Sequence, residues 1–290
     1  MHHVLKKRRL IIAAVKNRRY HKQQYKYGFK IPNTLEHALS IDKDNGNTLW
    51  QDSVIKEMGA VEIAFRFLEE GTTPPPGYTQ VMQSHLIFTI KMEDFRRKSR
   101  YVAGGHTVDA PATLTYTSVV SREAVRIALT LAALNDLEVK ASDIENAYLT
   151  APCSEKLWLR CGPEFGPHAG KQAIIVRALY GLKSAGSSFR NHLAECMCTL
   201  GWSSCLADQD LWHKPMTRPE DGFEYYAYML LYVDDALCIS HDSIKLLTDL
   251  DHYFKMKPGP IGDPDIYLGA KLRKTTLPIK VESWEMSSSK

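Results

Sequence analysis

The sequence predicts an α+β domain with a central antiparallel sheet. Several segments repeat apolar residues at helical spacing, and short runs rich in aromatic and aliphatic residues have the length of strands. Two of these runs, residues 223–233 and 236–240, are separated only by Asp234 and Asp235, which is typical of a β-hairpin. Mixed helices and hairpins of this kind favour the α+β class. With 290 residues, of which 44% are hydrophobic, the chain can form one large core or two smaller ones.

Charge divides the chain into a basic flexible arm at residues 1–34 and a domain at residues 35–290. Ten lysines and arginines lie in residues 1–30, and the first acidic residue is Glu36. The remaining chain holds 27 basic and 33 acidic residues, a net charge of −6. Such an arm can bind phosphate groups, act as a nuclear-localisation signal or match a mitochondrial leader, and a solvated tail explains it equally well.

The elements of the domain follow from apolar periodicity and from turn residues. The first half is expected to hold a turn at 42–46, a helix at 48–68, a basic-tipped hairpin of strands at 85–92 and 100–103, and a helix from Ser118 or Ser121 to residue 134. The second half is expected to hold strands at 137–142, 157–160 and 173–177, a helical segment after Asp143, helices at 187–200 and 243–254, and a last strand at 266–272.

The adjacent carboxylates of Asp234 and Asp235 carry the strongest chemical signal. Like charges a few ångströms apart disfavour joint ionisation, and a bound divalent cation offsets that repulsion. Oxygen ligands of this kind suit Mg²⁺, which takes one or two protein carboxylates together with water and substrate phosphate. Asp143 is the natural third ligand, because it ends a short strand and lies 91 positions upstream of Asp234. Without such a partner, the pair is a plain polar turn.

Five short motifs resemble those of copia-type retrotransposon reverse transcriptases, and they occur in the order of that family. Residues 232–235 read Tyr-Val-Asp-Asp and resemble the YxDD signature, and residues 143–149 are similar to the companion motif that contains the first aspartate. Residues 178–183 resemble the ALYGLKQ motif, with Ser184 where glutamine is usual. Residues 97–106 are similar to the RKARxVAGGH segment, and residues 267–269 are similar to the FLG strand.

The resemblance covers the chain from about Leu35 onward and implies the right-hand polymerase fold. This chain would hold the fingers and the palm, while the thumb and the RNase H domain are expected to be absent. The implied activity is RNA-directed DNA polymerase, a nucleotidyltransferase that extends a primer 3′-hydroxyl with dNTPs. Its partners would be an RNA or DNA template with primer, dNTPs and a separate thumb or RNase H segment.

The resemblance also implies a role for each motif residue. Two Mg²⁺ ions, or Mn²⁺, would be held by the catalytic Asp143, Asp234 and Asp235, with the carbonyl oxygen of Ile144 as a further ligand. Glu145 is expected to be an exposed acid at a helix start. The residues implied to contact the dNTP are Lys98, Arg100, Tyr148 as a steric gate, Tyr180 and Gly181. The residues implied to grip the primer are Tyr267, Leu268 and Gly269.

Several alternatives stay open. The fingertip cations fit a solvated hairpin face, and Tyr148 fits an ordinary core position. The whole chain could be a non-catalytic nucleic-acid-binding remnant or an assembly module derived from such an element. Six cysteines without a CxxC pair are expected to be free thiols, and no apolar run is long enough to cross a bilayer, so a soluble protein is expected. The expected location is cytoplasmic, within virus-like particles, with nuclear access through the arm.

Overall fold

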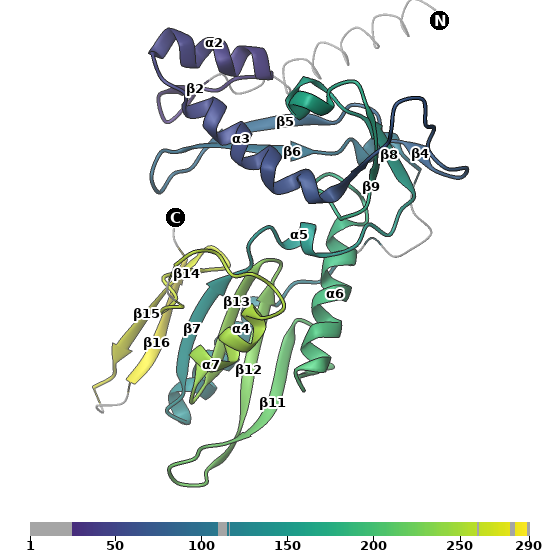
Figure 1. Cartoon of the computed structure of the whole chain (residues 1–290). Coiled ribbons are helices and arrows are strands. Elements are labelled where there is room, and N and C mark those ends of the chain that lie inside the picture. Colours follow the sequence, from purple (N-terminus) through teal and green to yellow (C-terminus); the bar gives the residue numbers. More distant parts are fainter. Residues whose placement is uncertain (1–24, 110–114, 116, 260, 279–281, 289–290) are drawn as a thin grey trace, which may run out of the picture.

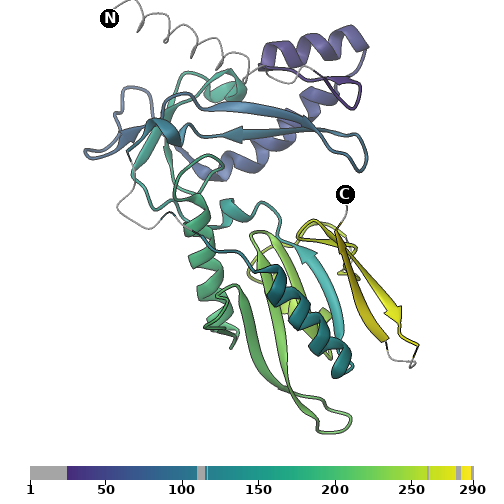
Figure 2. The same cartoon turned by 180° about the vertical axis from the view of Figure 1, so that it is seen from behind.

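The computed structural model describes residues 25–109, 115, 117–259, 261–278 and 282–288. It consists of two lobes (Figure 1, Figure 2). Within the described residues, the first lobe contains the α-helices α2 and α3, two two-stranded hairpins and a four-stranded sheet, and the second lobe contains a five-stranded sheet and a three-stranded sheet. The predicted mixture of helices and sheets is therefore confirmed, and the central sheet of the second lobe is antiparallel throughout.

The two helices of the first lobe are α2 (Leu35–Asn45) and α3 (Leu49–Val61). Gly46 ends α2 in the left-handed region, and the buried Asp42 carboxylate accepts hydrogen bonds from the backbone N–H groups of Trp50 and Gln51 at the start of α3. The expected turn at 42–46 is therefore wrong for residues 42–45, which are helical. Asp42 is buried because it caps the following helix.

The helix expected at 48–68 is shorter than its periodicity predicts. It ends at Val61 and is followed by the 3-10 helix η1 (Glu62–Ala64) and strand β3 (Phe65–Phe67). Phe65 pairs with Ile175 across the sheet, and its ring packs edge-on against Phe165 with 5.1 Å between ring centroids. Tertiary packing therefore overrides the local helical pattern.

The strands of the first lobe form two sheets and one small hairpin. Strands β5 (His85–Ile90) and β6 (Arg97–Val102) form the predicted antiparallel hairpin, although the second strand begins three residues earlier than expected. The four-stranded sheet has the order β3, β9 (Gln172–Ile175), β8 (Leu157–Arg160) and β4 (Thr79–Gln80). The small hairpin consists of β1 (Tyr25–Lys26) and β2 (Phe29–Lys30). Residues 25–30 of the expected flexible arm are thus structured, and residues 1–24 lie outside the described residues.

The five-stranded sheet of the second lobe has the order β10, β11, β12, β13, β7. Its strands are β7 (Glu138–Asp143), β10 (Ser203–Ser204), β11 (Leu211–Thr217), β12 (Glu224–Tyr232) and β13 (Asp235–Ser240). β11 was not predicted from the sequence, which has Pro215 in its middle. The proline is tolerated because β10 pairs only with residues 212 and 213, so β11 is an edge strand at Pro215.

Helices cover both faces of this sheet. α4 (Arg122–Leu134) begins after Ser121, one of the two expected caps, whose hydroxyl accepts the N–H of Ala124. It shares a core with Leu230 and Leu237. The neighbouring Met229 and Cys238 belong to the other core, together with α6 (Ala185–Thr199) and α7 (Ser243–Asp251). Alternate residues of a strand point to opposite faces, so α4 lies on one side and α6 and α7 on the other (Figure 1, Figure 2).

The three-stranded sheet packs beside α4 and consists of β14 (Ile266–Tyr267), β15 (Ala270–Thr276) and β16 (Glu282–Ser288). The single strand expected at 266–272 is wrong, because Leu268 and Gly269 form a turn with φ values of 52° and 69°. β16 was not predicted, and its Trp284 and Met286 pack on the core that contains α4.

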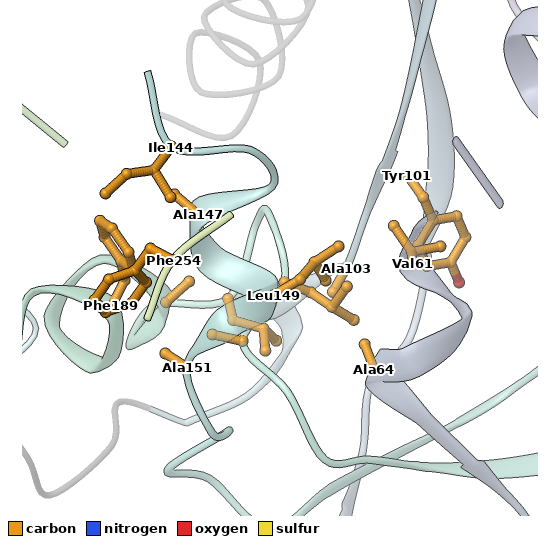
Figure 3. Close-up of a cluster of buried hydrophobic side chains, with 14 of the residues drawn as sticks. Val61, Ala64, Tyr101, Ala103, Ile144, Ala147, Leu149, Ala151, Phe189 and Phe254 are labelled. Atoms are coloured by element: carbon orange, nitrogen blue, oxygen red, sulfur yellow. The ribbon is translucent and has the colours of Figure 1, made fainter. Parts of the chain in front are cut away.

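A short helix joins the cores of the two lobes. α5 (Ala147–Thr150) follows β7, and its buried Ala147 and Leu149 belong to the same cluster as Tyr101 of the first lobe and Phe189 of α6 (Figure 3). Two further 3-10 helices, η2 (Gly105–Thr107) and η3 (Pro163–His168), complete the first lobe. The shared core fixes the segment after β7 relative to the β5–β6 hairpin.

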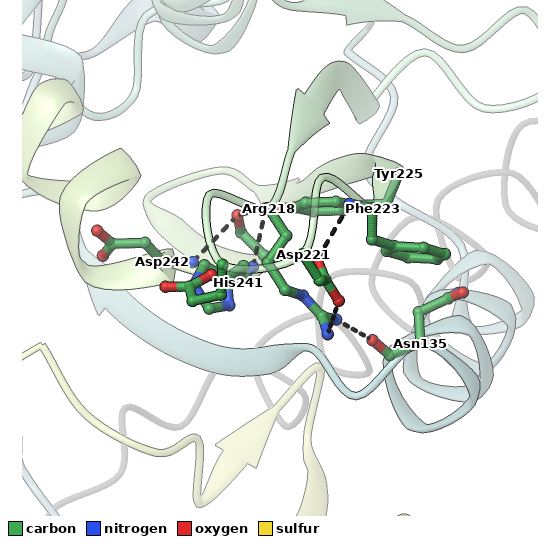
Figure 4. A network of polar contacts seen from close by, with 9 residues as sticks. Asn135, Arg218, Asp221, Phe223, Tyr225, His241 and Asp242 are labelled. Atoms are coloured by element: carbon green, nitrogen blue, oxygen red, sulfur yellow. Dashed lines mark hydrogen bonds and ion pairs between the residues drawn. The ribbon is translucent and has the colours of Figure 1, made fainter.

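The far end of the β11–β12 hairpin is tied to α4 by a polar network (Figure 4). The Arg218 guanidinium donates to the backbone oxygen of Asn135 at 2.8 Å and lies 3.5 Å from the Asp221 carboxylate. On the same side, the Tyr225 hydroxyl accepts the N–H of His241 at 3.1 Å. The bond from Arg218 to Asn135 holds the long hairpin against the end of α4, and the bond between Tyr225 and His241 links β12 to the segment after β13.

All six cysteines are free thiols, as expected. Among the residues described, no helix combines the length and apolar character needed to span a membrane.

Candidate catalytic site

The antiparallel pairing of β13 with β7 brings the three predicted aspartates to one end of the second-lobe sheet. Asp235 at the start of β13 lies opposite Asp143 at the end of β7. The backbone oxygen of Asp234 accepts the N–H of Ile144 at 2.7 Å, which extends this pairing by one step. Residues 91 positions apart in the sequence thus become neighbours in space, as the prediction required.

The turn that carries Asp234 has an unusual backbone. Tyr232 and Asp235 are cross-strand partners, so Val233 and Asp234 form a two-residue turn. Val233 has a φ of 55°, a conformation that is costly for a β-branched residue. Strained backbone of this kind is typical of functional sites, where it sets the direction of a side chain.

Lys257 links two of the three carboxylates. Its ammonium lies 2.7 Å from Oδ2 of Asp143 and 3.3 Å from Oδ2 of Asp234, and its backbone N–H donates to the backbone oxygen of Asp143 at 2.7 Å. Burial lowers the pKa of Lys257, but the hydrogen bond to Asp143 and the two carboxylate charges outweigh it and raise the pKa overall. Sequence reasoning missed Lys257, because no local pattern shows that it approaches Asp143.

The third carboxylate lies in a setting that resists ionisation. Burial, hydrogen bonding to Asp143 and the charges of Asp143 and Asp234 raise the pKa of Asp235 to about 7. Within the described part of the chain, no group of three His, Cys, Asp or Glu side chains is arranged as a metal-binding cluster. The donor set nevertheless fits a hard cation, because carboxylate oxygens from the end of β7 and from the β12–β13 turn already converge on one positive group.

Glu145 differs from its prediction. Its carboxylate pairs with the Lys255 ammonium at 2.8 Å, and its side chain is only 25% exposed. α5 begins after Asn146, whose φ is 51°. Glu145 is therefore a half-buried acid that ties the segment after β7 to the segment after α7. The backbone N–H of Glu145 also donates to the backbone oxygen of Lys255. The fully buried Ile144 is held by the same pairing of backbone segments.

The β5–β6 hairpin places two of the predicted cations near the carboxylates. The Arg100 guanidinium lies 4.9 Å from the centroid of the Tyr180 ring. Burial, together with repulsion from Arg100, Lys91 and Lys257, lowers the pKa of Lys98 to about 8. The repulsion from Lys257 shows that the hairpin faces the end of the second-lobe sheet, where the aspartates are.

Glu57 is a charged residue of this region that sequence reasoning missed. It lies on α3, and its carboxylate accepts the backbone N–H of Tyr101 on β6 at 2.9 Å. Burial raises the pKa of Glu57, while the hydrogen bond from Tyr101 and the charges of Lys98 and Arg100 oppose that rise. Glu57 therefore supplies negative charge behind the two cations of β6.

Tyr148 lies against the other predicted aromatic residue. Its ring meets the Tyr180 ring edge-on with 4.8 Å between centroids. Burial and then the Asp234 charge raise the pKa of the Tyr148 hydroxyl, so this side chain lies within the field of the aspartate turn. Tyr148 and Val233 also line a small cavity of about 30 Å³.

A buried ion pair supports the aspartate turn from behind. The Asp210 carboxylate, which is 5% exposed as a residue, accepts from Arg190 Nε at 2.9 Å and from the Ser118 hydroxyl at 2.5 Å. The backbone oxygen of Asp210 accepts the N–H of Leu231 at 3.0 Å. This network joins α6 to the strand residue that directly precedes Tyr232.

Gly181 is required by a close backbone approach. Its φ is 90°, and a Cβ atom there would lie 2.2 Å from the backbone oxygen of Ala103. The oxygen of Tyr180 accepts the N–H of Ala103 at 2.8 Å. The chain after β6 therefore leaves no room for a side chain at position 181.

The segment expected to grip a primer divides between core and turn. Tyr267 is buried and its hydroxyl donates to the backbone oxygen of Leu230 at 2.9 Å. Burial, followed by the charge of Asp235, raises the pKa of Tyr267 well above its ordinary value. Leu268 and Gly269 form the turn between β14 and β15. Tyr267 thus anchors this turn to the central sheet beneath the aspartates.

Comparisons with known proteins agree with these motifs. A protein-family model described as reverse transcriptase (RNA-dependent DNA polymerase) matches residues 74–289. The retrovirus-related Pol polyprotein from transposon RE2 of Arabidopsis thaliana is 25% identical over 242 residues, which cover 79% of this chain and 16% of that protein. The corresponding polyprotein from transposon RE1 of the same plant is 27% identical over 187 residues, or 62% of this chain and 12% of that protein.

A third relative extends the comparison to another plant. The retrovirus-related Pol polyprotein from transposon TNT 1-94 of Nicotiana tabacum is 31% identical over 163 residues, which cover 54% of this chain and 12% of that protein. The chain therefore spans a minor part of the length of each of these three relatives.

Proposed function

Since the chain belongs to the reverse transcriptase (RNA-dependent DNA polymerase) family, we propose that it extends the 3′-hydroxyl of a primer with dNTPs on an RNA or DNA template. The observation that carries this proposal is the convergence of Asp143, Asp234 and Asp235 at the end of one sheet, facing the cations of β6. In this proposal the first lobe is the fingers and the second lobe is the palm.

The three aspartates would hold two Mg²⁺ ions, or Mn²⁺, and the Ile144 carbonyl oxygen would add a ligand. When bound, the metal ions would activate the primer hydroxyl and stabilise the charge of the leaving pyrophosphate. The pKa of Asp235 is raised to about 7, and the positive charge of a bound cation would lower it, so that the carboxylate would be ionised. Lys257 lies on the same carboxylates, so it and a divalent cation would compete for Asp143 and Asp234.

The remaining motif residues would position the substrates. Lys98 and Arg100 would pair with the triphosphate, because charge-assisted hydrogen bonds to phosphate are strong and directional. Tyr148 would lie under the sugar, and Tyr180 and Gly181 would shape the floor beneath the nucleotide. The turn at residues 267–269 would contact the primer strand. Glu57 would keep Lys98 and Arg100 in place through β6.

Primer extension on an RNA template tests the proposal. With Mg²⁺ present, Asp143→Asn, Asp234→Asn and Asp235→Asn should each lower the extension rate by about two orders of magnitude or more. Nucleic-acid affinity should largely survive, since these side chains hold metal rather than bases. Asp263→Asn is the matched control, because Asp263 is an exposed aspartate that also pairs with a lysine, Lys140.

Two results would contradict this assignment. A wild-type extension rate in Asp234→Asn would remove the aspartates from the chemistry. Tight template binding without extension in either Mg²⁺ or Mn²⁺ would instead identify the chain as a nucleic-acid-binding remnant.

A further inference from the structure

Two hairpins of the first lobe meet at a cluster of aromatic rings and cations outside the candidate catalytic site. The Tyr27 ring in the β1–β2 turn meets the Phe95 ring at the tip of the β5–β6 hairpin, with 5.8 Å between centroids. Phe29 of β2 lies 6.2 Å from the same ring. We name the set of Lys26, Tyr27, Phe29, Phe95 and Arg97 the hairpin cluster.

The cations of the hairpin cluster lie against its rings. The Arg97 guanidinium is 4.3 Å from the centroid of Phe29, and the Lys26 ammonium is 5.3 Å from the centroid of Tyr27. Lys26 also donates to the Thr89 hydroxyl at 2.8 Å, which ties β1 to β5. These contacts hold the short N-terminal hairpin in a defined position and keep positive charge beside aromatic surface.

Two of the three rings of the hairpin cluster are exposed, whereas Phe29 is partly buried against the main core. Tyr27 is 48% exposed and Phe95 is 47% exposed, and the neighbouring Tyr25 is 58% exposed. Large exposed aromatic side chains that cluster together mark an interaction site, whereas single ones are common on any surface. Tyr25, Tyr27 and Phe95 are therefore not core residues.

The backbone at both tips is unfavourable for the residues that it carries. Tyr27 has a φ of 51° and Phe95 has a φ of 52°, in the left-handed region that aromatic residues rarely adopt. A two-residue hairpin turn such as Tyr27–Gly28 is usually formed by Asn-Gly or Asp-Gly. An aromatic residue lies at each tip despite this cost, and strained backbone of this kind is typical of functional positions.

Exposed rings beside lysine and arginine are what single-stranded nucleic acid requires. Unpaired bases stack on aromatic side chains, and the backbone phosphates pair with the cations, without any dependence on sequence. A duplex offers the phosphates but hides the faces of its bases. The acidic neighbours are Glu93 and Asp94 at the hairpin tip, and Asp94 already pairs with Arg96 at 3.2 Å.

We propose that the hairpin cluster binds single-stranded nucleic acid through base stacking on Tyr27 and Phe95. Residues 25–30 lie outside the residues that match the family model, so that match does not assign this site. Lys98 directly follows Arg97 on β6, and consecutive strand residues point to opposite faces. A nucleic-acid strand bound to the hairpin cluster therefore lies on the face of β6 opposite to Lys98. Its identity as the unpaired template ahead of the primer rests on the proposed function, but the binding itself does not.

The test measures equilibrium binding of the full chain to labelled oligonucleotides by fluorescence anisotropy. The probes are a 20-nucleotide oligo-U, a 20-nucleotide oligo-dT and a 20-base-pair duplex, each at several salt concentrations. The double variant Tyr27→Ala/Phe95→Ala should bind both single strands roughly tenfold or more weakly, because stacking of one base contributes this much. Duplex affinity should change by less than about twofold, and the salt dependence should stay the same.

Matched variants separate stacking from general damage. Tyr226→Ala removes a ring that is 52% exposed and that meets His213 edge-on at 5.5 Å, so it should leave single-strand affinity unchanged. Tyr27→Phe/Phe95→Tyr keeps both rings and should bind like the wild type. Arg97→Ala should instead flatten the salt slope by about 0.7, the value for one lost phosphate contact on a single strand.

Unchanged single-strand affinity in the alanine double variant would overturn the proposal, and so would an equal loss for the duplex. A thermal melt of each variant identifies any that fail to fold, in which case Tyr27→Ala alone takes the place of the double variant. Asp234→Asn distinguishes this site from the proposed function, since it should lose extension and keep single-strand binding. If the chain has no extension activity, the single-strand affinity of Tyr27→Ala/Phe95→Ala should still be lower than that of Tyr226→Ala.

Discussion

Tyr148 is a packing residue that is also the proposed steric gate for the sugar. Its ring contacts both Tyr180 and Phe189, at centroid distances of 4.8 and 6.1 Å, so its position is fixed from two sides. Burial raises the pKa of its hydroxyl, the charge of Asp234 raises it further and that of Arg100 opposes the rise, so the ring lies within range of both charged groups. A side chain held in this way can exclude a substituent on a sugar placed at the aspartates.

Replacing Tyr148 with valine should therefore change sugar selection. The ratio of ribonucleotide to deoxyribonucleotide incorporation should rise by roughly one to three orders of magnitude, since removing a steric exclusion changes the difference between two transition-state energies. Single-nucleotide incorporation assays measure this ratio. Tyr148→Phe is the control and should keep the wild-type ratio. The same ratio in a folded, active Tyr148→Val protein would make Tyr148 a packing residue only.

Lys98 should make nucleotide binding depend on pH. Burial lowers its pKa to about 8, so the ammonium is charged below that pH and becomes neutral above it. If Lys98 pairs with the triphosphate, KM for the dNTP should rise by roughly five- to tenfold between pH 7.5 and pH 9, in proportion to the lost charged form.

The matched variant for this prediction is Lys98→Arg, because arginine stays protonated over the whole range. Steady-state kinetics of both proteins at each pH give the comparison. A rise in KM that is the same in Lys98→Arg and in the wild type would assign the titration to another group.

At the scale of elements, the segment around Gly181 holds the junction between the lobes. The Gly181 backbone approaches Ala103, and the Gly105 backbone in turn approaches Gly181, where a Cβ on Gly105 would lie 2.3 Å from its oxygen. The chain after β6 and the chain before α6 are therefore packed backbone to backbone. This contact connects the β5–β6 hairpin, which carries the cations, to the helix that supports the aspartate turn.

Gly181→Ala should be strongly destabilising. A Cβ atom would overlap the Ala103 oxygen and the residue would keep a left-handed φ, so the free energy of unfolding should fall by about 2–4 kcal/mol. Gly222→Ala is the control, because Gly222 has a φ of 71° but no atom within 4 Å of the new Cβ. It should cost only about 1 kcal/mol. Urea denaturation measures both values, and equal losses would show that the close approach contributes nothing.

At the scale of the whole molecule, positive charge gathers at the N-terminal end of the sequence. Residues 1–24 contain eight lysines and arginines, and residues 25–30 contain Lys26 and Lys30. The described part of this region contacts the β5–β6 hairpin through Lys26 and Tyr27. The N-terminal region and the hairpin can therefore act together on one nucleic acid.

Deleting residues 1–24 should weaken template binding mainly through charge. The slope of log affinity against log salt should flatten by about 0.7 for each lost phosphate contact on a single strand. Deleting residues 1–30 should weaken single-strand binding further, because Tyr27 and Phe29 are then lost as well. Titrations at four or more salt concentrations separate the two effects. A slope that stays constant in both deletions would leave the arm with a localisation role.

Local signals predicted much of the fold and of the site. The β5–β6 hairpin, the Ser121 cap of α4 and the strand at Leu157–Arg160 follow from patterns within a few residues. Asp143, Asp234 and Asp235 were predicted to meet, and they do. The errors lie where a distant contact decides the conformation. Asp42 is helical and caps a neighbouring helix, and a strand can contain Pro215 because β10 ends before it reaches that residue.

By itself, the sequence determined the α+β class, most of the helices and strands, and the motifs that identify the family, because these depend on periodicity and residue type over short spans. Only the tertiary structure decided that Lys257 lies between two aspartates, that Glu57 lies behind the cations of β6, and that the β1–β2 hairpin presents Tyr27 beside Phe95. Each of these contacts joins segments that are far apart in the chain. Their formation depends on the register and burial of whole elements, which no short stretch of sequence encodes.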